Sequence, residues 1–171
     1  MNKILARWNT LDAESAAREA LPCCGSKAWA TVLASKRPIA NEASLIEQSN
    51  ATWLALPEEA WCEAFDSHPR IGQKKPQSHA TGESLHWSEQ EQRASATQDE
   101  TVQLALESSN RRYEQKFGRI FIVCASGKTS SEILAILEDR LHNDPATELR
   151  EAAEQQRQIM QLRLHRWLES D

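Results

Sequence analysis

A histidine set between a serine and a proline is the first candidate for chemistry in this sequence. The segment His68-Pro69-Arg70-Ile71-Gly72 directly follows a helical pattern that ends near Phe65. Proline restricts the residue before it to extended backbone, so Pro69 stiffens the chain that carries the imidazole. An imidazole has an unperturbed pKa near neutrality, which suits it to moving protons. These residues alone leave two interpretations open, a surface loop histidine and a group aimed at a ligand.

A second candidate is the carboxylate of Glu91, in the run Ser88-Glu89-Gln90-Glu91-Gln92. A serine followed three residues later by a glutamate predicts a capping box, in which Glu91 would only bond back to the helix start. Alternatively, Glu91 faces the same cavity as His68, and the unpaired N–H groups of a helix start at residues 88–92 cradle a ligand. The spacing alone favours the capping role.

The third candidate is Arg163, a charge placed inside an apolar stripe. It lies three residues after Met160 and four before Trp167 in the last helical pattern. A buried charge must be paired, extend toward solvent or meet a ligand. The residues alone favour a salt bridge to another helix over a ligand.

Several other kinds of site are excluded or disfavoured. Gly127-Lys128-Thr129 resembles the end of a phosphate-binding loop, but the glycine that this loop needs is replaced by Ile122. The histidines form no HExxH motif, and the cysteines lack metal-ligand spacing, which disfavours a metal site. Free thiols in a reducing cytoplasm fit these cysteines best. They are Cys23, Cys24, Cys62 and Cys124.

Composition and charge narrow the class further. The net charge is −5 and no basic stripe stands out, so nucleic acid is not an expected partner. No apolar run has the length of a signal peptide or a membrane span, so we expect no membrane partner. A chain of 171 residues is most simply one domain, residues 1–171.

The elements that must position these side chains are predicted to be helices. Five glycines and six prolines interrupt a sequence rich in Ala, Leu, Glu and Gln, which favours helix. Capping and periodicity predict an all-α, single-domain bundle of about eight helices. The expected helices cover residues 11–21 with Pro22 just beyond, 26–35, a stretch from Asn41, 57–65, 88–118 with a bend at 96–99, a stretch from Thr129, and one from Asp144.

Two segments between these helices are expected to be non-helical. Residues 66–87 contain several breakers and predict a long, functional or disordered loop. Residues 120–125 are strongly β-like, but no second strand is available to pair with them. We therefore expect a buried extended connector rather than a sheet strand.

Taken together, these segments resemble the OHCU decarboxylase family. The resemblance rests on blocks that run in order from about residue 11 to residue 168. The blocks are Phe65…His68-Pro69-Arg70-Ile71-Gly72, Ser88-x-x-Glu91-Gln92, Tyr113-x-x-x-Phe117-Gly118-x-x-Phe121-Ile122-Val123-Cys124-Ala125 and Leu162-Arg163-Leu164. One departure is Arg93-Ala94-Ser95-Ala96, where many members carry a glycine-containing stretch.

The resemblance implies an activity and its residues. Members decarboxylate 2-oxo-4-hydroxy-4-carboxy-5-ureidoimidazoline (OHCU), an intermediate of urate breakdown, to (S)-allantoin, without a cofactor. It implies that His68, Glu91 and Arg163 are catalytic, although the second Glu-Gln pair leaves Glu89 as an alternative to Glu91. It also implies a homodimer, and the free cysteines favour a cytoplasmic location. The implied substrate-binding residues are Pro69, Ser88, Glu89, Gln90, Glu91, Gln92, Phe121, Ile122, Val123, Cys124 and Ala125.

Two rival functions differ from this one in what they require. A non-enzymatic helical interaction domain would use Trp8, Trp29 or Trp53 as exposed anchors. Another lyase or racemase on the same scaffold would differ only in its substrate. We expect the three catalytic side chains to line one enclosed, metal-free pocket.

Overall fold

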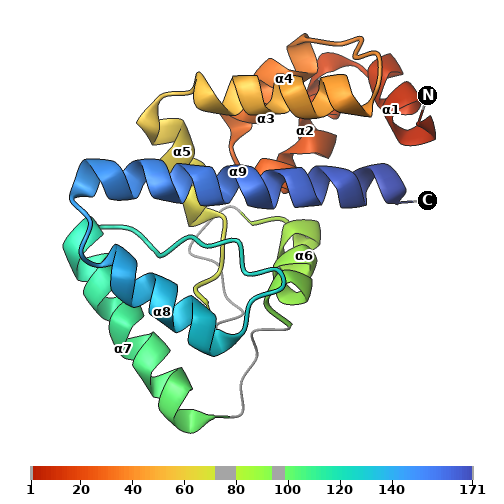
Figure 1. Ribbon diagram of the computed structural model, residues 1–171. Helices are drawn as coiled ribbons and strands as arrows, with labels where there is room; N and C mark the ends of the chain where they lie inside the picture. Colours follow the sequence, from red (N-terminus) through yellow and green to blue (C-terminus); the bar gives the residue numbers. More distant parts are fainter. Residues whose placement is uncertain (1, 72–79, 94–98, 171) are drawn as a thin grey trace. The chain divides into compact units, whose positions relative to one another are not determined.

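The computed structural model describes residues 2–71, 80–93 and 99–170. Over these ranges the backbone forms nine helices and no strand, which confirms the all-α class (Figure 1). The helices are α1 (Lys3–Thr10), α2 (Ala13–Cys24), α3 (Lys27–Ser35), α4 (Glu42–Leu54), α5 (Glu58–Asp66), α6 (Gly82–Gln92), α7 (Glu100–Phe117), α8 (Ser130–Arg140) and α9 (Pro145–Glu169).

The chain divides into two compact units. Unit 1 comprises Met1–Ala64 and Arg157–Asp171, and unit 2 comprises Phe65–Gln156. The long helix α9 therefore contributes its first half to unit 2 and its second half to unit 1. The assignment of residues 1–171 to a single domain stays a prediction.

Unit 1 is built around buried tryptophans. Trp8, Trp29 and Trp53 are each 0% exposed, so none of them can serve as the exposed anchor of an interaction domain. The burial of Trp8 and Trp29 is possible because their indole N–H groups find partners. Trp8 donates to the carbonyl of Ala16 at 2.9 Å, and Trp29 donates to the carbonyl of Ser49 at 3.2 Å.

The first two helices differ from the prediction. Helix α1 was not expected, and α2 continues through Pro22 to Cys24. Gly25 ends α2 instead, because its backbone adopts φ 84° and its N–H bonds the carbonyl of Leu21 at 2.7 Å. Pro22 lies in the last turn of α2, so the backbone hydrogen bond that it removes is close to the helix end.

Unit 2 has its own apolar core between α7, α8 and the connector, residues 120–125 (Figure 1). Asp99 caps the start of α7, and Gly118 ends it with φ 68°. The connector is buried and non-helical, and it is not a strand, as predicted. The buried core residues are Leu106, Tyr113, Phe117, Phe121, Val123, Ala125, Ile133, Leu137 and Leu141.

Helix α6 begins earlier than predicted. Its capping box is formed by Thr81 and Ser84, whose side chains each accept the other's backbone N–H. The predicted capping box of Ser88 and Glu91 is therefore wrong, and both residues lie within the helix. The expected loop of residues 66–87 ends by residue 81, and its residues 72–79 lie outside the described residues.

Candidate functional site

His68 is buried in unit 2, in the segment that follows α5. The residue is 7% exposed, and its Nε2 lies 2.7 Å from Oε1 of Gln156 on α9. Its backbone N–H donates to the carbonyl of Phe65 at 3.1 Å, so the turn is tied to the end of α5. The interpretation as a surface loop histidine is therefore wrong.

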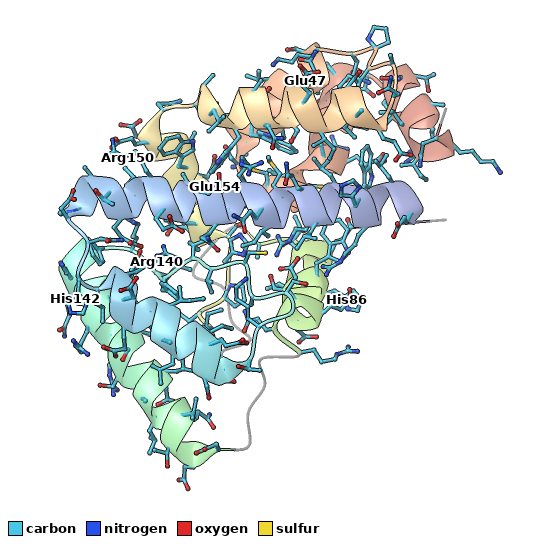
Figure 2. All side chains as sticks on the ribbon, in the orientation of Figure 1. Glu47, His86, Arg140, His142, Arg150 and Glu154 are labelled. Carbon is cyan, nitrogen blue, oxygen red and sulfur yellow. The ribbon has the colours of Figure 1, made fainter. Side chains whose placement is uncertain are left out.

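The other described histidines differ from His68. His86, His142 and His165 are more open to solvent, and Figure 2 labels the first two on α6 and just beyond α8. His79 lies outside the described residues. Burial with a polar partner thus separates His68 from the other histidines that the structure describes.

Arg70 anchors the segment that carries His68. Its Nε and Nη2 donate to the two carboxylate oxygens of Glu114 on α7, at 2.5 and 2.8 Å. This two-bond geometry is the strongest form of an arginine–carboxylate pair, and the carboxylate raises the pKa of the Arg70 guanidinium. The ion pair therefore fixes the chain two residues after His68 to helix α7.

Helix α6 presents two of its predicted site residues to the interior. Ser88 and Glu91 are 3% and 7% exposed, whereas Glu89 and Gln90 are exposed. Of the two candidate carboxylates, the one at position 91 is therefore the buried one. The predicted cradle of unpaired N–H groups is wrong, because residues 88–92 lie in helical backbone whose N–H groups bond the preceding turn.

The connector is held by side chains from neighbouring helices and from the turn that follows it. The N–H of Cys124 donates to Oε1 of Gln155 at 2.9 Å, and its carbonyl accepts from Lys128 at 2.8 Å. The carbonyl of Ile122 accepts from Nη1 of Arg140 at 2.7 Å. These contacts fix the extended backbone, and they engage the N–H of Cys124 with the protein itself.

A buried ion pair supports this connector, and sequence reasoning missed it. Arg140 and Glu148 are 4% and 0% exposed, and the carboxylate accepts from Nε of Arg140 at 3.0 Å. Figure 2 labels Arg140, at the end of α8. Glu148 also accepts from Asn143 at 2.9 Å and from the hydroxyl of Tyr113. Burial, followed by the bond to Glu148, raises the pKa of Tyr113.

Arg163 is buried in unit 1, as its place in the apolar stripe predicts. It is 1% exposed, and its Nη1 donates to the carbonyl of Pro22 at 3.3 Å. The nearby thiol of Cys24 has its pKa raised to about 12 by burial, against the opposing effect of the Arg163 charge. His68 and Glu91 belong to unit 2, so the convergence of the three side chains stays a prediction.

The described residues contain neither a candidate metal site nor a candidate membrane-spanning helix. No group of three or more His, Cys, Asp or Glu side chains in the described part of the chain is arranged to hold a metal ion. In the same residues, no helix combines the length and apolar character needed to span a bilayer.

Comparison with known proteins gives a consistent result. The family model "OHCU decarboxylase" matches residues 9–165. The "uric acid degradation bifunctional protein TTL" of Arabidopsis thaliana is 32% identical over 142 residues, covering 83% of this chain and 44% of that protein. The "2-oxo-4-hydroxy-4-carboxy-5-ureidoimidazoline decarboxylase" of Amia calva is 44% identical over 55 residues, covering 32% of this chain and 31% of that protein. The aligned region thus spans less than half of each relative.

A solved structure extends the likeness to three dimensions. This "Crystal structure of OHCU decarboxylase in the presence of (S)-allantoin" is 32% identical in sequence, with a TM-score of 0.76. The match covers 89% of this chain and 98% of that one. With the family model matched over nearly the whole sequence, this chain belongs to the OHCU decarboxylase family.

Proposed function

We propose that this protein decarboxylates OHCU to (S)-allantoin and carbon dioxide. The observation that carries the proposal is the buried imidazole of His68, held at 2.7 Å by Gln156 within the His-Pro-Arg-Ile-Gly segment of a family member. A histidine with no chemical task is more simply placed toward solvent, as His86, His142 and His165 are. The Amia calva relative is named for this substrate, and the solved neighbour was crystallised in the presence of this product.

To decarboxylate OHCU, a protein needs mainly to position the substrate and to transfer protons. The substrate carries a carboxylate on a ring carbon that also bears a hydroxyl group. When the bond to the carboxylate breaks, its electron pair moves into the conjugated ring toward the imine-type nitrogen. The nitrogen takes up a proton. The hydroxyl group then becomes a carbonyl as it loses its own proton, and a second proton adds to the carbon that bears the ureido group, so that one proton is taken up overall. The protein must hold the carboxylate out of the ring plane and deliver that proton to one face.

Each candidate residue fits one of these tasks. His68 moves the proton, because an imidazole can both accept and donate near neutral pH. Glu91 orients His68 or bonds polar hydrogens of the substrate, and Arg163 binds anionic or carbonyl oxygen with two parallel donors. We assign substrate contacts also to Pro69, to residues 88–92 and to the backbone of residues 121–125. Among the connector N–H groups, those of Val123 and Ala125 suit the substrate better than that of Cys124, which Gln155 engages.

The assay is stereochemical. Freshly generated OHCU is supplied to the purified protein, and the appearance of (S)-allantoin is followed by circular dichroism against spontaneous decay. We expect His68→Asn to fold normally and to lose at least about 100-fold in turnover, the usual contribution of a general acid or base. His142→Asn, at an exposed histidine, is the matched control and keeps full activity. Near-normal turnover by His68→Asn would remove the central role from this residue.

The arginine is tested by a change that keeps its charge. Arg163→Lys retains a cation but loses the planar pair of donors, so we expect reduced turnover from a folded protein. Unchanged kinetics would show that Arg163 is structural. If the wild-type protein leaves the decay of OHCU unaccelerated, another substrate on the same scaffold becomes the better proposal.

We further propose that the protein acts as a cytoplasmic homodimer. The homodimer rests on the family alone and is tested by light scattering of the purified protein, where a monomeric mass would contradict it. The cytoplasmic location rests on the free cysteines, which suit a reducing compartment.

A further inference from the structure

Gln156 is a buried amide on α9 that contacts His68. It is 0% exposed, and it occupies the interior face of α9, where an apolar side chain would pack without the cost of desolvating an amide. Its Oε1 lies 2.7 Å from Nε2 of His68, the shortest separation that a neutral hydrogen bond of this kind usually shows. The amide is thus directed at the imidazole.

We propose that Gln156 is a positioning residue that fixes the orientation and the tautomer of His68. The catalytic meaning of this inference rests on the proposed function. With Oε1 as the acceptor, Nε2 of His68 carries a proton in both the neutral and the charged ring. Nδ1 is then the nitrogen that gains and releases a proton. The amide therefore decides which side of the ring performs the transfer.

The surroundings of the pair show what this hydrogen bond adds. Arg70 ties the backbone beyond His68 to Glu114 on α7, and the N–H of His68 is tied to Phe65. These contacts hold the backbone but not the rotation of the ring about its own side-chain bonds, which the contact with Gln156 restricts. The chain is thus fixed on both sides of the imidazole, and the imidazole is oriented by the amide.

A neutral amide and a carboxylate would have different effects on the charge of the imidazole. A carboxylate next to an imidazole favours the charged ring and raises its pKa, whereas an amide orients the ring without adding charge. The adjacent residue Gln155 uses the same chemistry on the connector, accepting the N–H of Cys124 at 2.9 Å. Two consecutive glutamines of α9 thus each hold one of the non-helical segments of unit 2.

Two substitutions of similar size separate orientation from mere packing. Gln156→Met fills the same space without a strong hydrogen bond, and we expect kcat to fall between about 10-fold and 100-fold, as when histidine-orienting partners are removed at metal sites. KM should change by less than about twofold if Gln156 acts only through His68, because a positioning residue makes no binding contact of its own. Gln156→Glu should move the His68 limb of the kcat profile to higher pH by about one unit or more, since the new charge favours the imidazolium.

Gln161→Met is the matched control. Gln161 lies on the same helix and bonds Asn50 at 3.2 Å rather than His68, so its loss should leave the tautomer of His68 and the pH profile unchanged. A purely structural role for Gln156 predicts a lower melting temperature with normal kcat per folded molecule and an unmoved profile. That result would overturn the proposal.

A spectroscopic measurement tests the same hydrogen bond without relying on activity. Imidazole nitrogen shifts report the tautomer of each histidine, and the His68 signal is identified by its absence in His68→Asn. We expect the Nε2-protonated form in the wild type and a mixture of tautomers in Gln156→Met. An Nδ1-protonated wild type, or an unchanged signal in the variant, would overturn the inference. An inactive wild type with the expected tautomer would instead refute the proposed decarboxylation while supporting the hydrogen bond.

Discussion

The buried carboxylate of Glu148 is the group whose loss should cost the most stability for the least change in shape. Glu148→Gln keeps the side chain's volume and removes its charge, leaving the guanidinium of Arg140 buried without a counter-ion. Arg140 is 4% exposed and Glu148 is 0% exposed, so water screens neither group. Breaking one side of a buried ion pair costs about 3–5 kcal/mol in free energy of unfolding.

The hydrogen bonds of this carboxylate place the expected value in the upper half of that range. The carboxylate accepts from Arg140, from Asn143 and from Tyr113, and all of these partners approach as donors. A glutamine offers one acceptor oxygen, and its NH₂ group would face a donor that it cannot bond. An unsatisfied buried donor therefore adds to the lost charge pairing.

A matched control lies in the same unit. Arg112 and Glu138 form the same type of pair at 3.2 Å, but their side chains are 58% and 41% exposed. Exposed pairs contribute about 0–1 kcal/mol, so Glu138→Gln should change the free energy of unfolding by no more than about 1 kcal/mol. The contrast between the two variants therefore tests whether burial of the carboxylate, with its hydrogen bonds, causes the larger loss.

The measurement is urea unfolding followed by far-ultraviolet circular dichroism. Arg140→Met and the double variant complete a cycle, and we expect the double variant to lose less than the sum of the two single losses. The reason is that removing both charges leaves neither one buried alone. A Glu148→Gln loss no larger than that of Glu138→Gln would refute the reasoning, because it would mean that the Arg140 charge is not desolvated.

Two further predictions concern single positions. Gly118 adopts φ 68°, and a Cβ there would meet no atom within 4 Å. Gly118→Ala should therefore lower the free energy of unfolding by about 1 kcal/mol through backbone strain alone, and Gly118→Asn should lower it less, because asparagine tolerates this conformation better. The same urea assay measures both. Burial raises the pKa of the Cys24 thiol to about 12, so the reactive thiolate is nearly absent at pH 8 and appears only as the pH rises toward that value. Native Cys24 should therefore resist iodoacetamide while the half-buried Cys62 reacts, as measured by mass spectrometry of peptides; equal labelling of both would contradict the prediction.

The helices whose starts depend on local chemistry are the ones that sequence reasoning places correctly. Ser26, Asn41 and Thr129 each accept a backbone N–H of the first turn, as expected from their side chains. The start of α6 was predicted wrongly because two stretches, Thr81–Ser84 and Ser88–Glu91, both have capping-box spacing. Only tertiary packing selects the earlier one. Helix α1 was missed because its eight residues have little intrinsic stability, and they fold through the burial of Leu5 and Trp8.

For the candidate site, periodicity predicts burial but not partners. Arg163 was found because it interrupts an apolar stripe, and it is indeed 1% exposed. The burial of His68 has no such periodic signal, since it follows a helix rather than lying on one. Glu148 and Gln156 do have that signal: together with Ala152 they are spaced by four residues on α9, and all three are 0% exposed. Helical spacing therefore predicts the burial of Glu148 and Gln156 as it predicts that of Arg163.

A buried connector without a strand partner explains why these polar residues lie in the interior of unit 2. Extended backbone in a sheet satisfies its N–H and C=O groups through the neighbouring strand, whereas residues 120–125 have no such neighbour among the described residues. Side chains must replace it, and they do: Arg140 bonds the carbonyl of Ile122, and Gln155 accepts the N–H of Cys124. A cation used in this way needs a buried counter-charge, which Glu148 supplies. A β-like run predicted to be buried and unpaired therefore implies buried polar partners on the adjacent helices, and polar residues within their apolar stripes are where to look for them.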